Sequence, residues 1–180
     1  MIRRLNARVG DPVGFADLVD RRRPLGMHRG KPAYHLIRET YFDTSDGALA
    51  ARSMRLRLRS EARGHQVVEL LIGKEINLQG IAEVQFFETP VVGEGLYGTL
   101  GSDSEVATRI RDVVEVDALR PGAAMDIDRE TRDLRLGRFG KPTHRIVFDD
   151  VIAHAPGAAR EFQEVTVVEL GAGKITLEEL

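Results

Sequence analysis

Apolar and polar residues alternate along several stretches of this 180-residue chain, which is the pattern of β-strands with one buried face. The clearest stretch is residues 54–60, MRLRLRS, where Arg55, Arg57 and Arg59 fall on one face and apolar residues fall on the other. A turn at EARGH and a second apolar stretch at 67–72 complete a predicted hairpin. Further strands are predicted over 34–42, 83–92, 125–136, 144–152 and 162–170.

Helical patterns are few and short. Asp11 followed by Pro12 indicates an N-cap and a first helical residue, and it predicts a helix over 12–20. Apolar residues recur at helical spacing within 102–114, and the closing sequence ITLEEL reads as the first turn of an incomplete helix. Connections between strands are mostly short, which favours antiparallel pairing. The pattern predicts an α+β chain that is mainly antiparallel β, folded as a barrel or a strongly curved sheet with a few short helices.

Composition narrows the class of protein. With 42% hydrophobic and 30% charged residues the chain can build a core, and its length suits one domain over residues 1–180. It contains no cysteine, which excludes disulfides, thiolate nucleophiles and cysteine-bound zinc. No apolar run is long enough to span a membrane, and the start does not resemble a secretory signal, so we expect a cytoplasmic protein. The net charge of −2 argues against nucleic acid as a partner.

Charge is distributed unevenly along the chain. Residues 1–31 carry eight Lys/Arg and three Asp, a net +5, and residues 52–63 carry five Arg and one Glu, a net +4. Residues 161–180 carry five Glu and one Lys, a net −4. If the fold brings these segments together, a cationic surface meets carboxylates, which suits a metal-bound polyanion. The alternative is that the charges are spread over a solvated surface.

Several familiar motifs are absent or unconvincing. GEGLYG, residues 93–98, matches a dinucleotide fingerprint, but we expect it to form a loop because the following residues delay the helix that should meet the pyrophosphate. The five histidines have no metal-ligand spacing, and there is no P-loop or nucleophile elbow. The triplet at 21–23 lacks interleaved aromatic residues and is expected in a solvated loop.

The sharpest signal is TYFDTSDGALAARSMRLRLR, residues 40–59. Its YFDT motif, followed by a short helix and an LRLR strand, resembles the CYTH family, the triphosphate tunnel metalloenzymes. Further similarity follows in the expected order at 73–74, 86–90, 128–132, 148–150 and 162–169. The resemblance implies an eight-stranded, closed or nearly closed antiparallel tunnel that binds a triphosphate-containing small molecule or polyphosphate with Mg²⁺ or Mn²⁺.

Arginine suits such a ligand, because guanidinium groups bind phosphate with paired donors and stay charged, and arginines on alternate strand positions lie about 7 Å apart. Within 128–132 the better match to the family's basic strand is Arg132, with Arg129 second. The candidate substrate-binding residues are Arg4, Arg55, Arg57, Arg59, Lys74, Arg129 and Arg132. The candidate metal ligands are Glu88, Asp149, Glu164 and Glu169, of which Glu88 and Glu164 are also assigned catalytic roles.

The chain departs from the family at several positions. Members usually begin with an ExExK strand, but the corresponding positions here are Ile2, Arg4 and Asn6. Arg4 could occupy the vacant cation position and stabilise phosphate without a metal, which would favour binding over turnover. Other motif positions that are charged in the family hold Val84 and Phe86 here, and acids near the end of the chain are replaced as well, by Arg145, Thr166 and Val168.

The sequence is compatible with three functions. The first is a metal-dependent triphosphatase with a remodelled first motif. The second is a catalytically degenerate module that binds a phosphate chain or a nucleotide. The third is a structural or partner-binding domain whose interior is filled by apolar side chains. The oligomeric state is not determined by the sequence.

Overall fold

The structure, a computed structural model, describes residues 2–21, 23–62, 64–73, 81–155 and 157–170. Within these ranges one antiparallel sheet has the strand order β2-β7-β3-β4-β5-β6-β1-β9-β8. The strands are β1 (Ile2–Val9), β2 (His28–Arg29), β3 (Ala33–Asp43), β4 (Met54–Glu61), β5 (Gln66–Ile72), β6 (Ile81–Pro90), β7 (Arg120–Arg135), β8 (His144–Ala155) and β9 (Ala158–Glu169). The helices are α1 (Pro12–Asp20), α2 (Gly95–Leu100) and α3 (Glu105–Arg111), with single 3₁₀ turns η1 (Pro24–Gly26), η2 (Ala50–Arg52) and η3 (Val116–Ala118).

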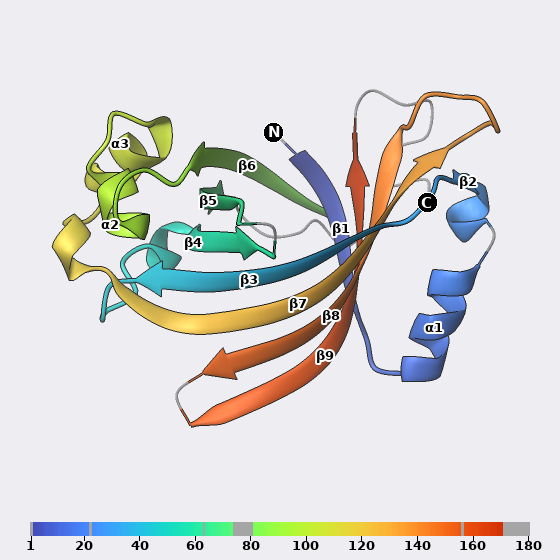
Figure 1. Cartoon of the computed structure of the whole chain (residues 1–180), viewed down its shortest axis with the longest axis horizontal. Helices are drawn as coiled ribbons and strands as arrows, with labels where there is room; N and C mark the ends of the chain where they lie inside the picture. The colour runs from blue at the N-terminus through green and yellow to red at the C-terminus, as the bar shows by residue number, and fades with distance from the viewer. Residues whose placement is uncertain (1, 22, 63, 74–80, 156, 171–180) are drawn as a thin grey trace.

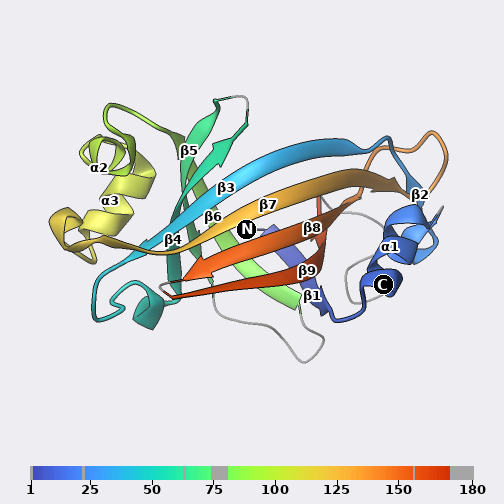
Figure 2. The ribbon, with the colours of Figure 1, turned by 60° about the horizontal axis from the view of Figure 1, so that its bottom comes forward.

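The sheet curls until its two ends meet. The long strand β7 pairs with β3 on one side and with β8 on the other, so eight strands follow one another in a ring, and β2 is attached to β7. Figure 2 shows β3, β7, β8 and β9 as one long curved wall. The shortest described pairing in the ring joins β1 to β6 over four residue pairs, so the barrel is tunnel-like but incompletely closed. The predicted fold class is therefore confirmed.

Helices cover the outer face of the sheet at opposite ends of the molecule (Figure 1). At one end α2 and α3 pack on the apolar sides of β4 and β5, where Leu56, Leu70, Leu100 and Ile110 are fully buried. This contact uses one face of the alternating β4 sequence, which leaves the arginines of β4 on the inner face.

At the other end, α1 covers β8 and β9. Asp11 caps it as the sequence predicts, because its carboxylate accepts hydrogen bonds from the amides of Val13 and Gly14, both at 3.1 Å. Phe15 of this helix meets Phe148 of β8 edge-to-face, with 5.9 Å between ring centroids. The outer faces of the barrel are thus occupied by apolar packing at both ends.

The YFDT motif has a structural role in the connection from β3 to β4. The Asp43 carboxylate accepts hydrogen bonds from the backbone amides of Thr44, Leu49 and Ala50, at 2.7, 2.9 and 3.0 Å. These bonds satisfy amides at the start of the short η2 turn, which has too few residues to satisfy them internally. The motif therefore fixes how the chain enters the arginine-bearing strand.

The prediction of a loop at GEGLYG is wrong, because helix α2 begins within this sequence, at Gly95. Leu96, Thr99 and Leu100 of α2 are buried against the sheet, and this packing stabilises a helix that its glycines disfavour. The predicted helix over 102–114 is confirmed in the shorter form of α3, whereas the predicted final helix at ITLEEL lies outside the described residues. None of the described helices has the length and apolar character needed to cross a bilayer.

Gly98 allows α2 to approach the preceding chain. A Cβ atom at this position would lie 2.7 Å from the backbone oxygen of Val92, which is closer than such contacts occur. We expect Gly98→Ala to lower the free energy of unfolding by about 1–3 kcal/mol, measured by urea denaturation. At Gly137 a Cβ would meet nothing within 4 Å, so Gly137→Ala should change stability by less than about 1 kcal/mol. Equal effects of the two substitutions would contradict this account of α2.

Candidate functional site

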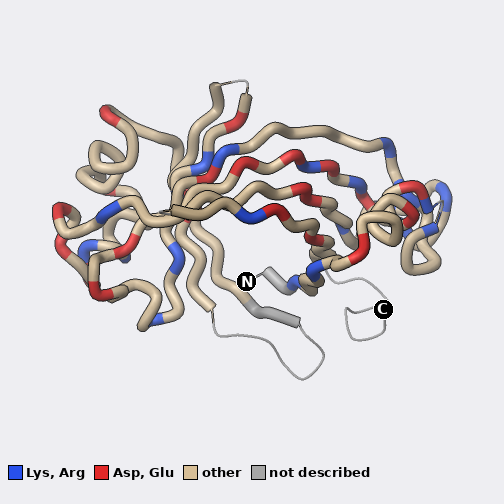
Figure 3. Tube along the Cα trace, turned by 90° about the horizontal axis from the view of Figure 1, so that it is seen from below, with Lys and Arg blue, Asp and Glu red and all other residues tan. Residues whose placement is uncertain are grey.

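The inner faces of the strands enclose a cavity of about 530 Å³. Its walls are strongly charged, since seven arginines and four carboxylates line it among the described residues. The arginines are Arg4, Arg8, Arg55, Arg57, Arg59, Arg129 and Arg145, and the carboxylates are Glu39, Glu69, Asp149 and Glu164. Figure 3 shows acidic and basic residues interleaved along neighbouring strands.

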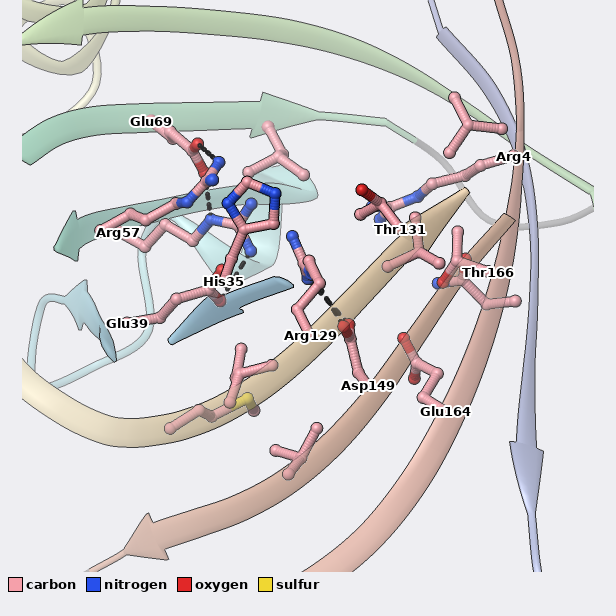
Figure 4. Close-up of a pocket in the computed structure, with 18 of the residues that line it drawn as sticks. Arg4, His35, Glu39, Arg57, Glu69, Arg129, Thr131, Asp149, Glu164 and Thr166 are labelled. Atoms are coloured by element: carbon pink, nitrogen blue, oxygen red, sulfur yellow. Dashed lines mark hydrogen bonds and ion pairs between the residues drawn. The ribbon is translucent and has the colours of Figure 1, made fainter. Parts of the chain in front are cut away.

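All three arginines of β4 line this cavity, as the alternation of β4 predicts. The central one, Arg57, lies between two carboxylates from the neighbouring strands (Figure 4). Its Nη1 donates to Glu39 Oε2 of β3 at 2.7 Å, and its Nε donates to Glu69 Oε2 of β5 at 2.5 Å. The exposed fractions of the two glutamates are 1% and 0%, so both charges depend on arginine for their stabilisation. Burial alone would lower the pKa of Arg57, but Glu39, Tyr41 and Glu69 raise it overall.

Arg59 is also engaged by carboxylates. Its Nη1 donates to Glu69 Oε1 at 3.1 Å, and its Nη2 pairs with Glu61. Tyr41 extends the network on the other side, donating its hydroxyl to Glu39 Oε2 at 2.7 Å, and burial raises the pKa of this phenol to about 12. The result is a continuous ion-pair network across β3, β4 and β5 that holds Arg57 and Arg59 in place.

Glu39 and Glu69 were not identified from the sequence. One signal was present, since Glu69 is the single charged residue in the apolar run VVELLI, and a lone carboxylate in a buried strand needs a partner. For Glu39 the only signal was its position two residues before Tyr41, which places both side chains on the same face of the strand. The pairing register, which sets Glu69 opposite Arg57 and Glu39 opposite Arg59 within diagonal reach of Arg57, is a property of the folded sheet.

A second group of charges lies on β7, β8 and β9, beside the first (Figure 4). Arg129 donates two hydrogen bonds of 2.7 Å to Asp149, from Nε and Nη2. Burial alone would lower the pKa of Arg129, but the neighbouring Asp149 raises it overall. Glu164 stands opposite Asp149 in the register of β8 and β9. Burial, and then the charge of Asp149, raise the pKa of Glu164, while Arg8 and Arg4 oppose this shift.

Three arginines of the cavity are not ion-paired to another described residue: Arg4, Arg8 and Arg55. The Nε of Arg4 is buried and has no hydrogen-bond partner. Burial lowers the pKa of Arg4, and the positive charges of Arg55 and Arg57 lower it further. Arg8 stacks over the ring of Phe162, with 4.4 Å between its Cζ and the ring centroid. Glu164 stands opposite Arg8 in the register of β1 and β9, and its charge acts on Arg4 as well, but it forms no ion pair with either among the described contacts.

The structure brings together most of the predicted anion-binding residues, but not all of them. Arg4, Arg55, Arg57, Arg59 and Arg129 line the cavity. Arg132, the better sequence match on β7, lies opposite Ile146 on the outer face and pairs with Glu130. Strand parity decides between Arg129 and Arg132, because residues three apart point to opposite faces. Lys74 lies outside the described residues.

The four predicted metal ligands are only partly brought together. Asp149 and Glu164 share the cavity, whereas Glu169 is on the face of β9 that neighbours His144, and Glu88 is exposed and does not line the cavity. Among the described residues, no three His, Asp or Glu side chains are grouped so that they could hold a metal ion. The donors present in the described cavity therefore do not fit a divalent metal, since Asp149 is already held by Arg129 and Glu164 is the remaining carboxylate beside it.

No family model matches this chain, and no curated protein matches it. Solved structures do share its fold. One is a protein from Hippeastrum, assigned as an adenylyl cyclase and reported to have a dominant triphosphatase activity; it has a TM-score of 0.64 and 19% identity, with 95% of this chain and 80% of that chain covered. Another, assigned as an adenylate cyclase from Bacillus halodurans, has a TM-score of 0.57 and 16% identity, with 95% and 83% covered. At these identities the likeness shows the fold alone, and the resemblance to the CYTH family is supported at that level.

The network predicts that Arg57 is essential for stability. Arg57→Ala leaves Glu39 and Glu69 buried beside a cavity without their shared partner, so we expect the free energy of unfolding to fall by about 3–5 kcal/mol in urea denaturation. Arg55 is exposed and not ion-paired to any described residue, and Arg55→Ala should stay within about 0.5 kcal/mol of the parent protein. An Arg57→Ala protein of parental stability would show that the network does not hold the sheet.

The raised pKa of Glu164 predicts a pH-dependent effect of its removal. Because its pKa is higher in the folded state, the folded state binds the proton more tightly, and the ionised carboxylate costs stability as pH rises through that pKa. Glu164→Gln should therefore raise the melting temperature at pH 7. The gain should disappear below the unfolded-state pKa of about 4.3. The exposed Glu161 serves as a control, since Glu161→Gln should show no such pH dependence; a gain for Glu164→Gln that is equal at pH 7 and pH 4 would disprove the assignment.

Proposed function

We propose that this chain, taken as one CYTH-like domain over residues 1–180, binds phosphate groups in its channel through arginine side chains and without a divalent metal ion. The observation that carries the proposal is Arg4, whose buried Nε has no hydrogen-bond partner and whose pKa is lowered by burial and by Arg55 and Arg57. An anion bound beside Arg4 would accept a hydrogen bond from its guanidinium group and would relieve the repulsion between Arg4, Arg55 and Arg57.

The position of Arg4 supports a role in place of the family's metal. Arg4 stands in β1 where related sequences have a carboxylate of the ExExK motif, and its side chain lines the cavity. A carboxylate there would help to hold a cation that neutralises phosphate, whereas a guanidinium neutralises phosphate directly and stays charged at all accessible pH. The likeness in fold to triphosphate-processing proteins supports phosphate as the anion.

The interior argues against a purely structural domain. Phe86 and Val168 line the channel, as that alternative expects, but the cavity of about 530 Å³ also has seven arginines in its walls. Four of these arginines are ion-paired to carboxylates, but Arg4, Arg8 and Arg55 are not paired to another described residue, and burial of Arg4 is costly unless an anion uses its charge. We therefore favour binding over a scaffold role.

Hydrolysis is a second candidate function. It is favoured by Asp149 and Glu164 in the cavity and by the triphosphatase activity reported for the structurally similar Hippeastrum protein. Enzymes of this chemistry usually rely on metal ions to neutralise charge, and the described residues group no such site, so we derive no metal-assisted step. Release of phosphate from tripolyphosphate that requires Mg²⁺ or Mn²⁺ and is lost in Asp149→Asn would establish hydrolysis.

The binding proposal is tested by isothermal titration calorimetry with inorganic pyrophosphate at low ionic strength in EDTA. We expect binding to the parent protein, and a dissociation constant raised about 10-fold or more in Arg4→Gln, since a charge-assisted hydrogen bond contributes about 1.5–3 kcal/mol. Arg38 is a matched control, because it is an exposed strand arginine outside the cavity, and Arg38→Gln should change the constant by less than about twofold. Absence of binding, or binding only with added Mg²⁺, would refute the proposal.

A further inference from the structure

The two arginines that the sequence singles out most clearly are already occupied by the protein's own carboxylates. Glu69 forms ion pairs with both Arg57 and Arg59. Glu39 forms a second ion pair with Arg57, with 2.7 Å between Nη1 and Oε2. A phosphate that approached Arg57 would also approach two buried carboxylates and would be repelled by both. Glu39 and Glu69 thus take the place that a phosphate group would have on this part of the channel wall.

The net charge of the cavity is consequently small. Among the residues that the structure describes, six carboxylates either line the cavity or are ion-paired to its arginines: Glu39, Glu61, Glu69, Asp133, Asp149 and Glu164. Against the seven arginines of the described lining they leave one net positive charge, seven minus six. Every phosphate added to a chain adds negative charge, so without metal a longer chain is neutralised less completely by these residues than a shorter one.

Another part of the wall offers no donors. Ile37, Ile127 and Val151 form a buried apolar cluster against which Met125 and Phe162 pack, and four of these five line the cavity. A phosphate chain that extended along this surface would lose its hydration without gaining hydrogen bonds. Among the described residues, Arg4, Arg8 and Arg55 line the cavity without an ion pair to a carboxylate, so their donors are the ones most available to an anion.

We infer that Glu39 and Glu69 restrict the channel to ligands with one or two phosphate groups, bound by the arginines that are not ion-paired to another described residue, Arg4, Arg8 and Arg55. The inference rests on the proposed function and adds a limit on chain length to it. The limit is set by side chains that occupy the positions of further phosphates, and these side chains come from β3 and β5, the neighbours of the arginine-bearing strand.

The parent protein tests this directly. Dissociation constants for inorganic phosphate, pyrophosphate and tripolyphosphate are compared by calorimetry in EDTA at one ionic strength. A third phosphate that met its own arginine would tighten binding about 10-fold or more, whereas we expect tripolyphosphate to bind within about threefold of pyrophosphate. A larger preference for tripolyphosphate overturns the inference but leaves the proposed function standing, while failure of all three anions to bind refutes the proposed function itself.

A variant provides the converse test. Glu69→Gln keeps the shape of the side chain and releases part of Arg57 and Arg59, so tripolyphosphate affinity should rise at least fivefold while phosphate affinity stays unchanged. Glu161→Gln, an exposed acid outside the cavity, is the control and should change neither constant. Circular dichroism and a thermal melt establish that Glu69→Gln is folded, and if it is not, the parent series alone decides. A folded Glu69→Gln protein with unchanged tripolyphosphate affinity overturns the inference.

Discussion

The ion-pair network around Arg57 is the interaction on which the rest of the channel depends. One guanidinium on β4 is bonded to a carboxylate from β3 and to another from β5, so three neighbouring strands are tied together on the inner side of the sheet. The two carboxylates are almost fully buried, where an unpaired charge is costly and a paired one is held rigidly. The network therefore fixes both the register of these strands and the direction of the side chains that face the cavity.

Closure of the sheet gives this network its setting. Because β7 pairs on both edges, the inner face of every strand in the ring looks onto the same enclosed space, and charges that are far apart in the sequence become neighbours. Arg129 and Asp149 meet across β7 and β8, and Arg4 enters from β1 at the incompletely closed seam. No residue of the described helices lines the cavity. The helices cover the outer face, which commits the alternating strands to pointing their charged sides inward.

A channel of this kind can treat anions in two ways. Where carboxylates outnumber the free arginines, a metal ion is needed to attract phosphate, and the family resemblance implies that arrangement. In this chain other residues, among them Arg4, stand where the ExExK motif has carboxylates in the first strand. Most of the described carboxylates of the cavity are ion-paired to arginines. This arrangement underlies the proposal that guanidinium groups recognise phosphate directly, and Glu39 and Glu69 occupy two of the arginines that could otherwise take part.

The sequence by itself determined the strands, their alternation and the capped first helix, because these depend on local periodicity and on turn chemistry that the residues carry with them. It also identified Arg57 and Arg59 as one face of a strand. Tertiary structure alone decided what that face meets. Glu39 and Glu69 became partners of Arg57 through pairing of neighbouring strands, closure of the sheet turned the face of β7 with Arg129 inward and the face with Arg132 outward, and α2 formed despite its glycines because the core buries Leu96 and Leu100. Each of these outcomes rests on contacts between residues distant in the chain, which a one-dimensional pattern does not contain.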